Sequence, residues 1–109
     1  NSTAGDAEFE RLLDAESPRV REATLRALGV RERPSLRRAI TRQVDASEPA
    51  VAVMAVYALG HLEDRASVPR LRRELSATRS AMRMTAAWAL GMIEDPAVAP
   101  DLEQLARTD

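Results

Sequence analysis

The dipeptide Leu-Gly recurs at a constant spacing of 31 residues, at Leu28-Gly29, Leu59-Gly60 and Leu90-Gly91. A fixed period of this length is typical of a solenoid, in which each repeat buries one face against the next. A chain of 109 residues built in this way forms one domain that lacks a single central core. We therefore expect function to lie on a surface rather than in an enclosed cavity.

The composition favours helices. Hydrophobic residues make up 45% of the chain, yet only three are aromatic, namely Phe9, Tyr57 and Trp88, so the core must be aliphatic and rich in alanine. Runs of β-branched and aromatic residues that would form strands are absent from the sequence. There is no cysteine, which excludes a disulfide framework, a thiolate metal site and a cysteine nucleophile. The sequence predicts an all-α fold.

Each Leu-Gly pair closes a helical segment, and a second helix is expected after each one. Pro18 and Pro49 occupy the first helical position, where the missing N–H costs nothing, and Ser17 fits an N-cap. Seven helices are expected in a single domain over residues 6–107, after a disordered terminus at 1–5. The expected helices lie near residues 6–14, 18–30, 34–45, 49–62, 66–77, 80–93 and 97–107.

A helical period of 100° per residue places five positions of each Leu-Gly helix on one buried arc. Counted from the glycine, these are positions −9, −5, −2, −1 and +2. They are apolar except in the first repeat and hold Val20, Thr24, Ala27, Leu28, Arg31, Val51, Ala55, Ala58, Leu59, Leu62, Met82, Ala86, Ala89, Leu90 and Ile93. The second helices bury Leu36, Ile40, Val44, Val68, Leu71, Leu75, Val98, Leu102 and Leu105. The glycine either admits a neighbouring helix or ends its own.

Two segments carry a resemblance to a known family. The segment from Val20-Arg21 to Gly29, and Ala89-Leu90-Gly91 with the acidic turn before Pro96, resemble HEAT-like repeats of the phycobilisome-lyase type. The resemblance spans residues 6–107 and implies a right-handed α-solenoid, or α-α superhelix, of about three repeats. It also implies that the Leu-Gly helices line the concave surface. Proteins of this type bind peptides and proteins, attach chromophores, hydroxylate with a metal, or repair DNA bases.

The stripe opposite the buried arc holds the candidate binding site. Its positions −7, −3 and +1 are polar in the first repeat and apolar in the next two. The candidate partner-binding residues on and beside this stripe are Arg26, Val53, Met54, Tyr57, His61, Met84, Trp88 and Met92. Tyr57 and Trp88 share one repeat position, which makes them adjacent anchors, with the methionines as adaptable contacts. The methionines could instead fill gaps between helices. The stripe favours a non-catalytic scaffold that binds a protein or peptide.

Catalytic chemistry has little support in the sequence. His61 is the only histidine, and no serine lies in a strained nucleophile turn. We therefore expect no catalytic residues, no metal and no cofactor, with a lyase-type or accessory role as the residual alternative. The metal-dependent hydroxylases that this repeat class resembles carry His-Glu pairs on their inner helices. The matching positions here are Glu22-Ala23, Val53-Met54 and Met84-Thr85, and none of them is a His-Glu pair.

Two further functions stay open. The apolar stripe could mediate homodimerisation, or the eight arginines of residues 19–42, against two glutamates, could bind nucleic-acid phosphates. Nucleic acid is the less favoured partner because both ends of the chain are acidic and the isoelectric point is about 5.9. No apolar stretch approaches the roughly 20 residues of a membrane span. We expect a soluble protein, with a cytoplasmic location slightly favoured, and the sequence names no partner.

Overall fold

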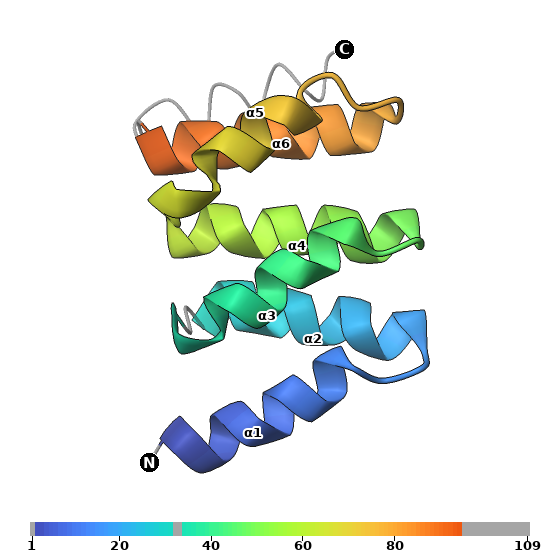
Figure 1. The fold of residues 1–109 in the computed structure, drawn as a ribbon, viewed down its shortest axis with the longest axis vertical. Coiled ribbons are helices and arrows are strands. Elements are labelled where there is room, and N and C mark those ends of the chain that lie inside the picture. Colours follow the sequence, from blue (N-terminus) through green and yellow to red (C-terminus); the bar gives the residue numbers. More distant parts are fainter. Residues whose placement is uncertain (1, 32–33, 95–109) are drawn as a thin grey trace.

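The computed structural model describes residues 2–31 and 34–94. All regular structure in these ranges is helical, with six α-helices and three short 3-10 helices (Figure 1). In chain order the elements are α1 Ser2–Leu13, α2 Pro18–Arg31, η1 Pro34–Leu36, α3 Arg37–Arg42, η2 Gln43–Asp45, α4 Pro49–Leu62, η3 Arg65–Ser67, α5 Val68–Glu74 and α6 Ser80–Glu94. The expected helix at 97–107 falls outside the described residues.

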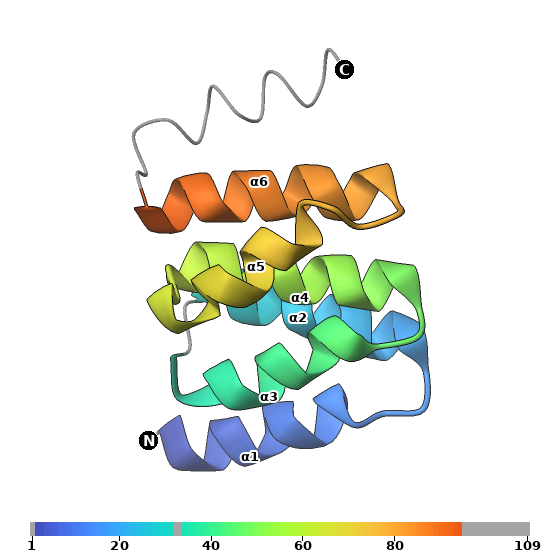
Figure 2. The same cartoon turned by 45° about the horizontal axis from the view of Figure 1, so that its top comes forward.

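The helices form two layers. α2, α4 and α6 run parallel to one another in one layer, and α1, α3 and α5 run the opposite way in the other (Figures 1 and 2). Each repeat therefore contributes one helix to each layer, and successive repeats stack along the longest dimension of 39 Å. This arrangement confirms the predicted all-α solenoid.

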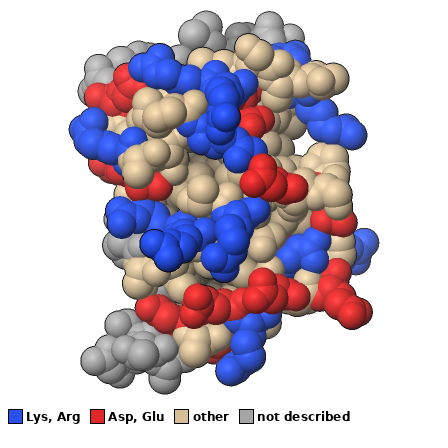
Figure 3. Space-filling view, in the orientation of Figure 1, with Lys and Arg blue, Asp and Glu red and all other residues tan. Residues whose placement is uncertain are grey.

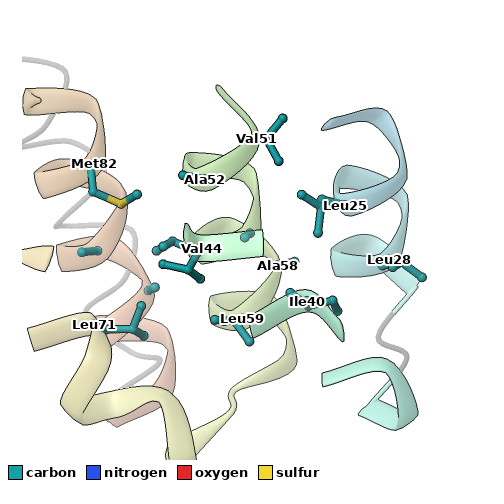
Figure 4. Close-up of a cluster of buried hydrophobic side chains, with 14 of the residues drawn as sticks. Leu25, Leu28, Ile40, Val44, Val51, Ala52, Ala58, Leu59, Leu71 and Met82 are labelled. Atoms are coloured by element: carbon teal, nitrogen blue, oxygen red, sulfur yellow. The ribbon is translucent and has the colours of Figure 1, made fainter. Parts of the chain in front are cut away.

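The core lies between the layers and is aliphatic. Leu25, Leu28, Ile40, Leu59 and Leu71 are fully buried, and Figure 4 shows their side chains in the spaces between neighbouring helices. Four alanines of the buried arc have no exposed surface, which lets the helices of one layer approach closely. These are Ala55, Ala58, Ala86 and Ala89.

Gly60 allows α6 to pack closely against α4 and does not terminate α4. α4 continues two residues beyond it, and Glu63 takes the left-handed conformation after the last turn, with φ of 52°. A methyl group on Gly60 would lie 2.7 Å from Cζ3 of Trp88 and 3.0 Å from the Cα of Ala89. Both distances are shorter than van der Waals contact, so α6 can pack this closely only against glycine.

Arginine side chains donate hydrogen bonds to backbone carbonyls just before α2 and α6, and one of them also connects two repeats. Arg21 donates to the backbone carbonyls of Ala15 at 2.6 Å and Glu16 at 3.2 Å, and its other nitrogen pairs with Glu48 at 2.5 Å. Glu48 belongs to the next repeat, so this one side chain spans two units. Arg83 makes the same kind of backbone bonds at the start of α6.

A second connection between repeats runs from α5 to the end of the preceding unit. Arg70 donates to Asp45 at 2.8 Å and to Glu74 at 3.0 Å. The hydrogen bond and the charge of Arg70 hold the pKa of Asp45 below its ordinary value. Ser47, which donates to Glu48 at 3.1 Å, likewise lowers the pKa of that carboxyl.

α1 begins at Ser2, within the stretch 1–5 that was expected to precede the domain. Two expectations about buried residues were wrong. Val20 is 37% exposed, because position −9 points toward the preceding helix of the same layer, as Val51 does in Figure 4, and no helix precedes α2 there. Leu75 is also exposed, because α5 ends at Glu74 and leaves it beyond the last turn.

Candidate functional site

Three of the predicted site residues form one aromatic cluster on α4 and α6. The rings of Tyr57 and Trp88 are stacked, with centroids 5.3 Å apart and an interplanar angle of 13°. His61, one turn after Tyr57, meets that ring edge-on at 4.5 Å and lies 5.0 Å from the indole. This offset stacking is a favourable geometry for aromatic rings. The repeat period correctly placed Tyr57 beside Trp88.

The exposure expected for Trp88 was wrong. Its side chain is only 9% exposed, because it lies between the Tyr57 ring and the bare backbone of Gly60. Tyr57 and His61 are half-buried and keep accessible surface. Trp88 therefore forms the floor of the cluster, and the accessible surface belongs mainly to the two rings above it.

A groove opens beside this cluster, at the start of α4 and α6. Its volume is about 540 Å³, and it is open to solvent. The lining comes from all three helices of the layer and from the residue before α6: Glu22, Pro49, Ala50, Val53, Met54, Arg79, Ser80 and Ala81. We call this the α4 groove. Its walls are mostly apolar, with one carboxylate and one guanidinium at the edges.

The hollow exists because small residues occupy one position of the repeat. Ala50 and Ala81 both lie ten residues before their glycines, on the stripe opposite the buried arc, and both are exposed. Val53 and Met54 rise beside them and are half-buried against the core. Alanine on a helix face usually indicates close packing of helices, so Ala50 and Ala81 were not among the predicted site residues. The signal was their place on the solvent-facing stripe.

Charged residues of the layer lie along its α2 edge and at both ends of α6. Arg26 is exposed and pairs with Glu22 at 3.2 Å, one turn away on the same helix. Arg79 lies at the mouth of the α4 groove, and no hydrogen bond or ion pair joins its side chain to another described residue. Met84 and Met92 are half-buried on α6, outside the groove lining.

The described arginines of residues 19–42 do not form a single surface. Arg26 lies in the α2/α4/α6 layer, whereas Arg37, Arg38 and Arg42 lie on α3 in the other layer. Figure 3 shows basic side chains gathered over α3 and α5, bordered by acidic side chains over α1. The Arg21 guanidinium is already bonded to the backbone carbonyl of Ala15 and to the carboxylate of Glu48. This division weakens the interpretation of the section as one phosphate-binding tract.

Nothing in the described ranges has the make-up of a metal site or a membrane span. No group of three or more His, Asp or Glu side chains is placed to hold a metal ion among residues 2–31 and 34–94. Likewise, none of the helices described combines the length and apolar character that crossing a lipid bilayer requires.

Antiparallel helix pairs stacked in two layers define an α-solenoid of short helical repeats. The family model for HEAT repeats matches residues 6–73 and again residues 38–109, so the chain belongs to the HEAT repeat family. HEAT repeats generally act as scaffolds for protein interactions. No curated protein matches the chain.

Proposed function

We propose that this protein is a non-catalytic scaffold that binds a protein or peptide segment on the α2/α4/α6 layer. Within the HEAT family we assign it to the phycobilisome-lyase type, on the sequence pattern around Leu28-Gly29 and Leu90-Gly91. The observation that carries the proposal is the α4 groove, an open apolar hollow of about 540 Å³. A groove of this kind on a repeat surface can accept an apolar side chain of a partner.

The partner contacts divide between the groove and the aromatic cluster. Val53 and Met54 receive an apolar side chain, and the ring of Tyr57 packs against the next residue of the partner. His61 and Arg26 supply polar contacts at the periphery. Because Tyr57 is half-buried, such a contact covers on the order of 50 Å² of its apolar surface and contributes about 1 kcal/mol before association costs.

Trp88 has an indirect role in this proposal. Its ring supports Tyr57 from below and fixes the orientation of the phenol, so its contribution to binding passes through Tyr57. Met84 and Met92 flank the cluster on α6 and extend the apolar surface. Since methionine side chains are flexible, this part of the surface adapts to partners of different shape.

A site-specific crosslinking experiment tests the proposal. A photo-reactive amino acid at Ala50, inside the groove, is compared with the same residue at Ala7, an exposed position on α1. Both variants are irradiated in lysate of the source cells. A defined heterologous product formed from position 50 and absent from position 7 supports the proposal. Crosslinking of position 50 only to a second copy of the chain identifies a homodimer instead and contradicts it.

A further inference from the structure

Three arginines of α3, namely Arg37, Arg38 and Arg42, line the same cavity. Six arginines of the described residues donate side-chain hydrogen bonds: Arg11, Arg21, Arg26, Arg70, Arg72 and Arg83. Arg38 and Arg42 make neither a hydrogen bond nor an ion pair with any described residue, and Arg37 has only an ion pair at 3.6 Å. Each guanidinium carries five N–H donors, so α3 presents a concentrated set of unused donors.

These three arginines surround one cavity. Its volume is about 620 Å³, and it lies between α1, α3 and the turn that leads into η3. The residues that line it are Glu10, Ser35, Arg37, Arg38, Ala39, Thr41, Arg42, Asp64 and Ala66. We call it the α3 cavity. Figure 3 views this side of the molecule, with basic side chains over α3 in the middle.

Asp64 holds one of the arginines at the cavity wall. Its carboxylate is buried, and one oxygen accepts a hydrogen bond from the Ser67 hydroxyl at 2.5 Å. The other oxygen, Oδ1, has no hydrogen-bond donor, and Nη1 of Arg37 lies 3.6 Å from it. A buried carboxylate without a nearby cation is costly, so this pair keeps the Arg37 side chain close to the cavity. Asp64 is thus a positioning residue for Arg37.

We propose that the α3 cavity binds a phosphate group carried by a side chain of a partner protein. Arg38 and Arg42 are one helical turn apart on α3, so both guanidinium groups can reach a single anion. A phosphate monoester has close to two negative charges and three acceptor oxygens, which fits several planar guanidinium forks. A carboxylate offers one charge and two oxygens. The proposal is independent of the α4 groove, which lies on the opposite layer.

The surroundings of the cavity favour a phosphorylated basic segment over nucleic acid. Glu10 of α1 lines the cavity, Asp14 is exposed just after the end of that helix, and Figure 3 shows acidic side chains along this border. A polyanion that crosses the cavity would be repelled by these carboxylates. A single phosphate flanked by arginine or lysine would instead pair its phosphate with the arginines of α3 and its basic residues with the carboxylates. The preferred ligand is therefore phosphoserine or phosphothreonine next to basic residues.

Fluorescence anisotropy with labelled peptides tests this inference. The probes are an arginine-containing phosphoserine peptide, the same peptide with unmodified serine, inorganic phosphate as competitor, and a short DNA duplex. The phosphopeptide is expected to bind at least about tenfold more tightly than its unmodified form, because charge-assisted hydrogen bonds are lost without the phosphate. The double variant Arg38→Ala/Arg42→Ala should remove this difference.

A matched pair of substitutions separates the cavity from general charge. Arg65→Ala/Arg73→Ala removes two exposed arginines whose side chains make no hydrogen bond or ion pair with another described residue, and it should retain the preference. The double variant Glu10→Gln/Asp14→Asn should weaken phosphopeptide binding, because the contacts to its basic residues are lost, and should not weaken competition by inorganic phosphate. Equal binding of both peptides, equal losses in the two arginine variants, inorganic phosphate as tight as the phosphopeptide, or a preference for duplex DNA would each overturn the proposal.

Discussion

The indole ring of Trp88 lies against the bare backbone of Gly60. Cζ3 of the indole would be 2.7 Å from a methyl group on that residue, and the same ring system is stacked on Tyr57. The glycine that defines the repeat is therefore a packing requirement in the second unit. It makes room for a large side chain that belongs to the third.

Gly60→Ala should destabilise the fold. In an open helix interior, this change stabilises by about 1 kcal/mol, because alanine has the higher helix propensity. Here the added methyl group would overlap both the indole and the backbone of Ala89, so we expect a net loss of about 1–3 kcal/mol. Urea denaturation measures the free energy of unfolding. Ala50→Gly, at an exposed position of the same helix, reports the propensity effect alone, and a gain in stability for Gly60→Ala would refute this close packing.

Trp88→Ala and Tyr57→Ala should differ in their effects. Trp88 is almost fully buried, so its removal should cost about 3–5 kcal/mol of unfolding free energy. Tyr57 is half-buried and should cost clearly less. Thermal unfolding of the two single variants gives the comparison. Similar losses for both would show that Trp88 does not form the floor of the cluster.

Arg21→Ala should destabilise more than Arg83→Ala. Both residues hold backbone carbonyls before their helices, but Arg21 also pairs with Glu48 of the next repeat. Loss of a part-buried arginine that makes three charge-assisted bonds should cost about 1–3 kcal/mol. Urea denaturation at low and high salt measures the free energy of unfolding of both variants. Salt should reduce only the part of the Arg21 loss that comes from its ion pair with Glu48. An equal loss in the two variants would contradict a connection between repeats.

The Arg70–Asp45 pair should make stability depend on acidic pH. The pKa of Asp45 is lower in the folded protein than its ordinary value of 3.8, mainly because of the hydrogen bond from Arg70. The pair therefore stabilises the fold above about pH 4, and this contribution is lost as the pH falls through the folded pKa. Asp45→Asn should be less stable than the parent near pH 7 and equally stable near pH 2. If Asp45→Asn is still less stable than the parent near pH 2, the loss comes from packing and not from the ion pair. The effect is small because the Asp45 carboxylate is largely exposed, so solvent screens its interaction with Arg70.

The helices could be predicted because each has its own local signals. Pro49 and the 31-residue period placed α4, and proline again marks the first turn of α2. The buried arc followed from helical periodicity, and its alanines are indeed buried at Ala55 and Ala86. These features depend on one helix at a time, which is why a single sequence suffices to find them.

The site was harder to predict because it depends on distances between helices. The period correctly paired Tyr57 with Trp88, but the close approach at Gly60 that buries the indole is a property of two helices together. The α4 groove was missed for a similar reason. A small residue such as Ala50 leaves a hollow only if no neighbouring side chain fills it, and periodicity does not show this.

The most direct test of the proposed function is the affinity of a peptide ligand for a protein whose groove has been filled. Peptides are selected from a random display library on the parent protein, and the best binder is titrated against Ala50→Trp and Ala7→Trp. Both substitutions place the same bulk on an exposed alanine, one inside the α4 groove and one on α1. If the groove is the binding site, Ala50→Trp weakens binding by about a hundredfold or more and Ala7→Trp leaves it unchanged. Unchanged binding to Ala50→Trp, or equal weakening by both variants, would contradict the account.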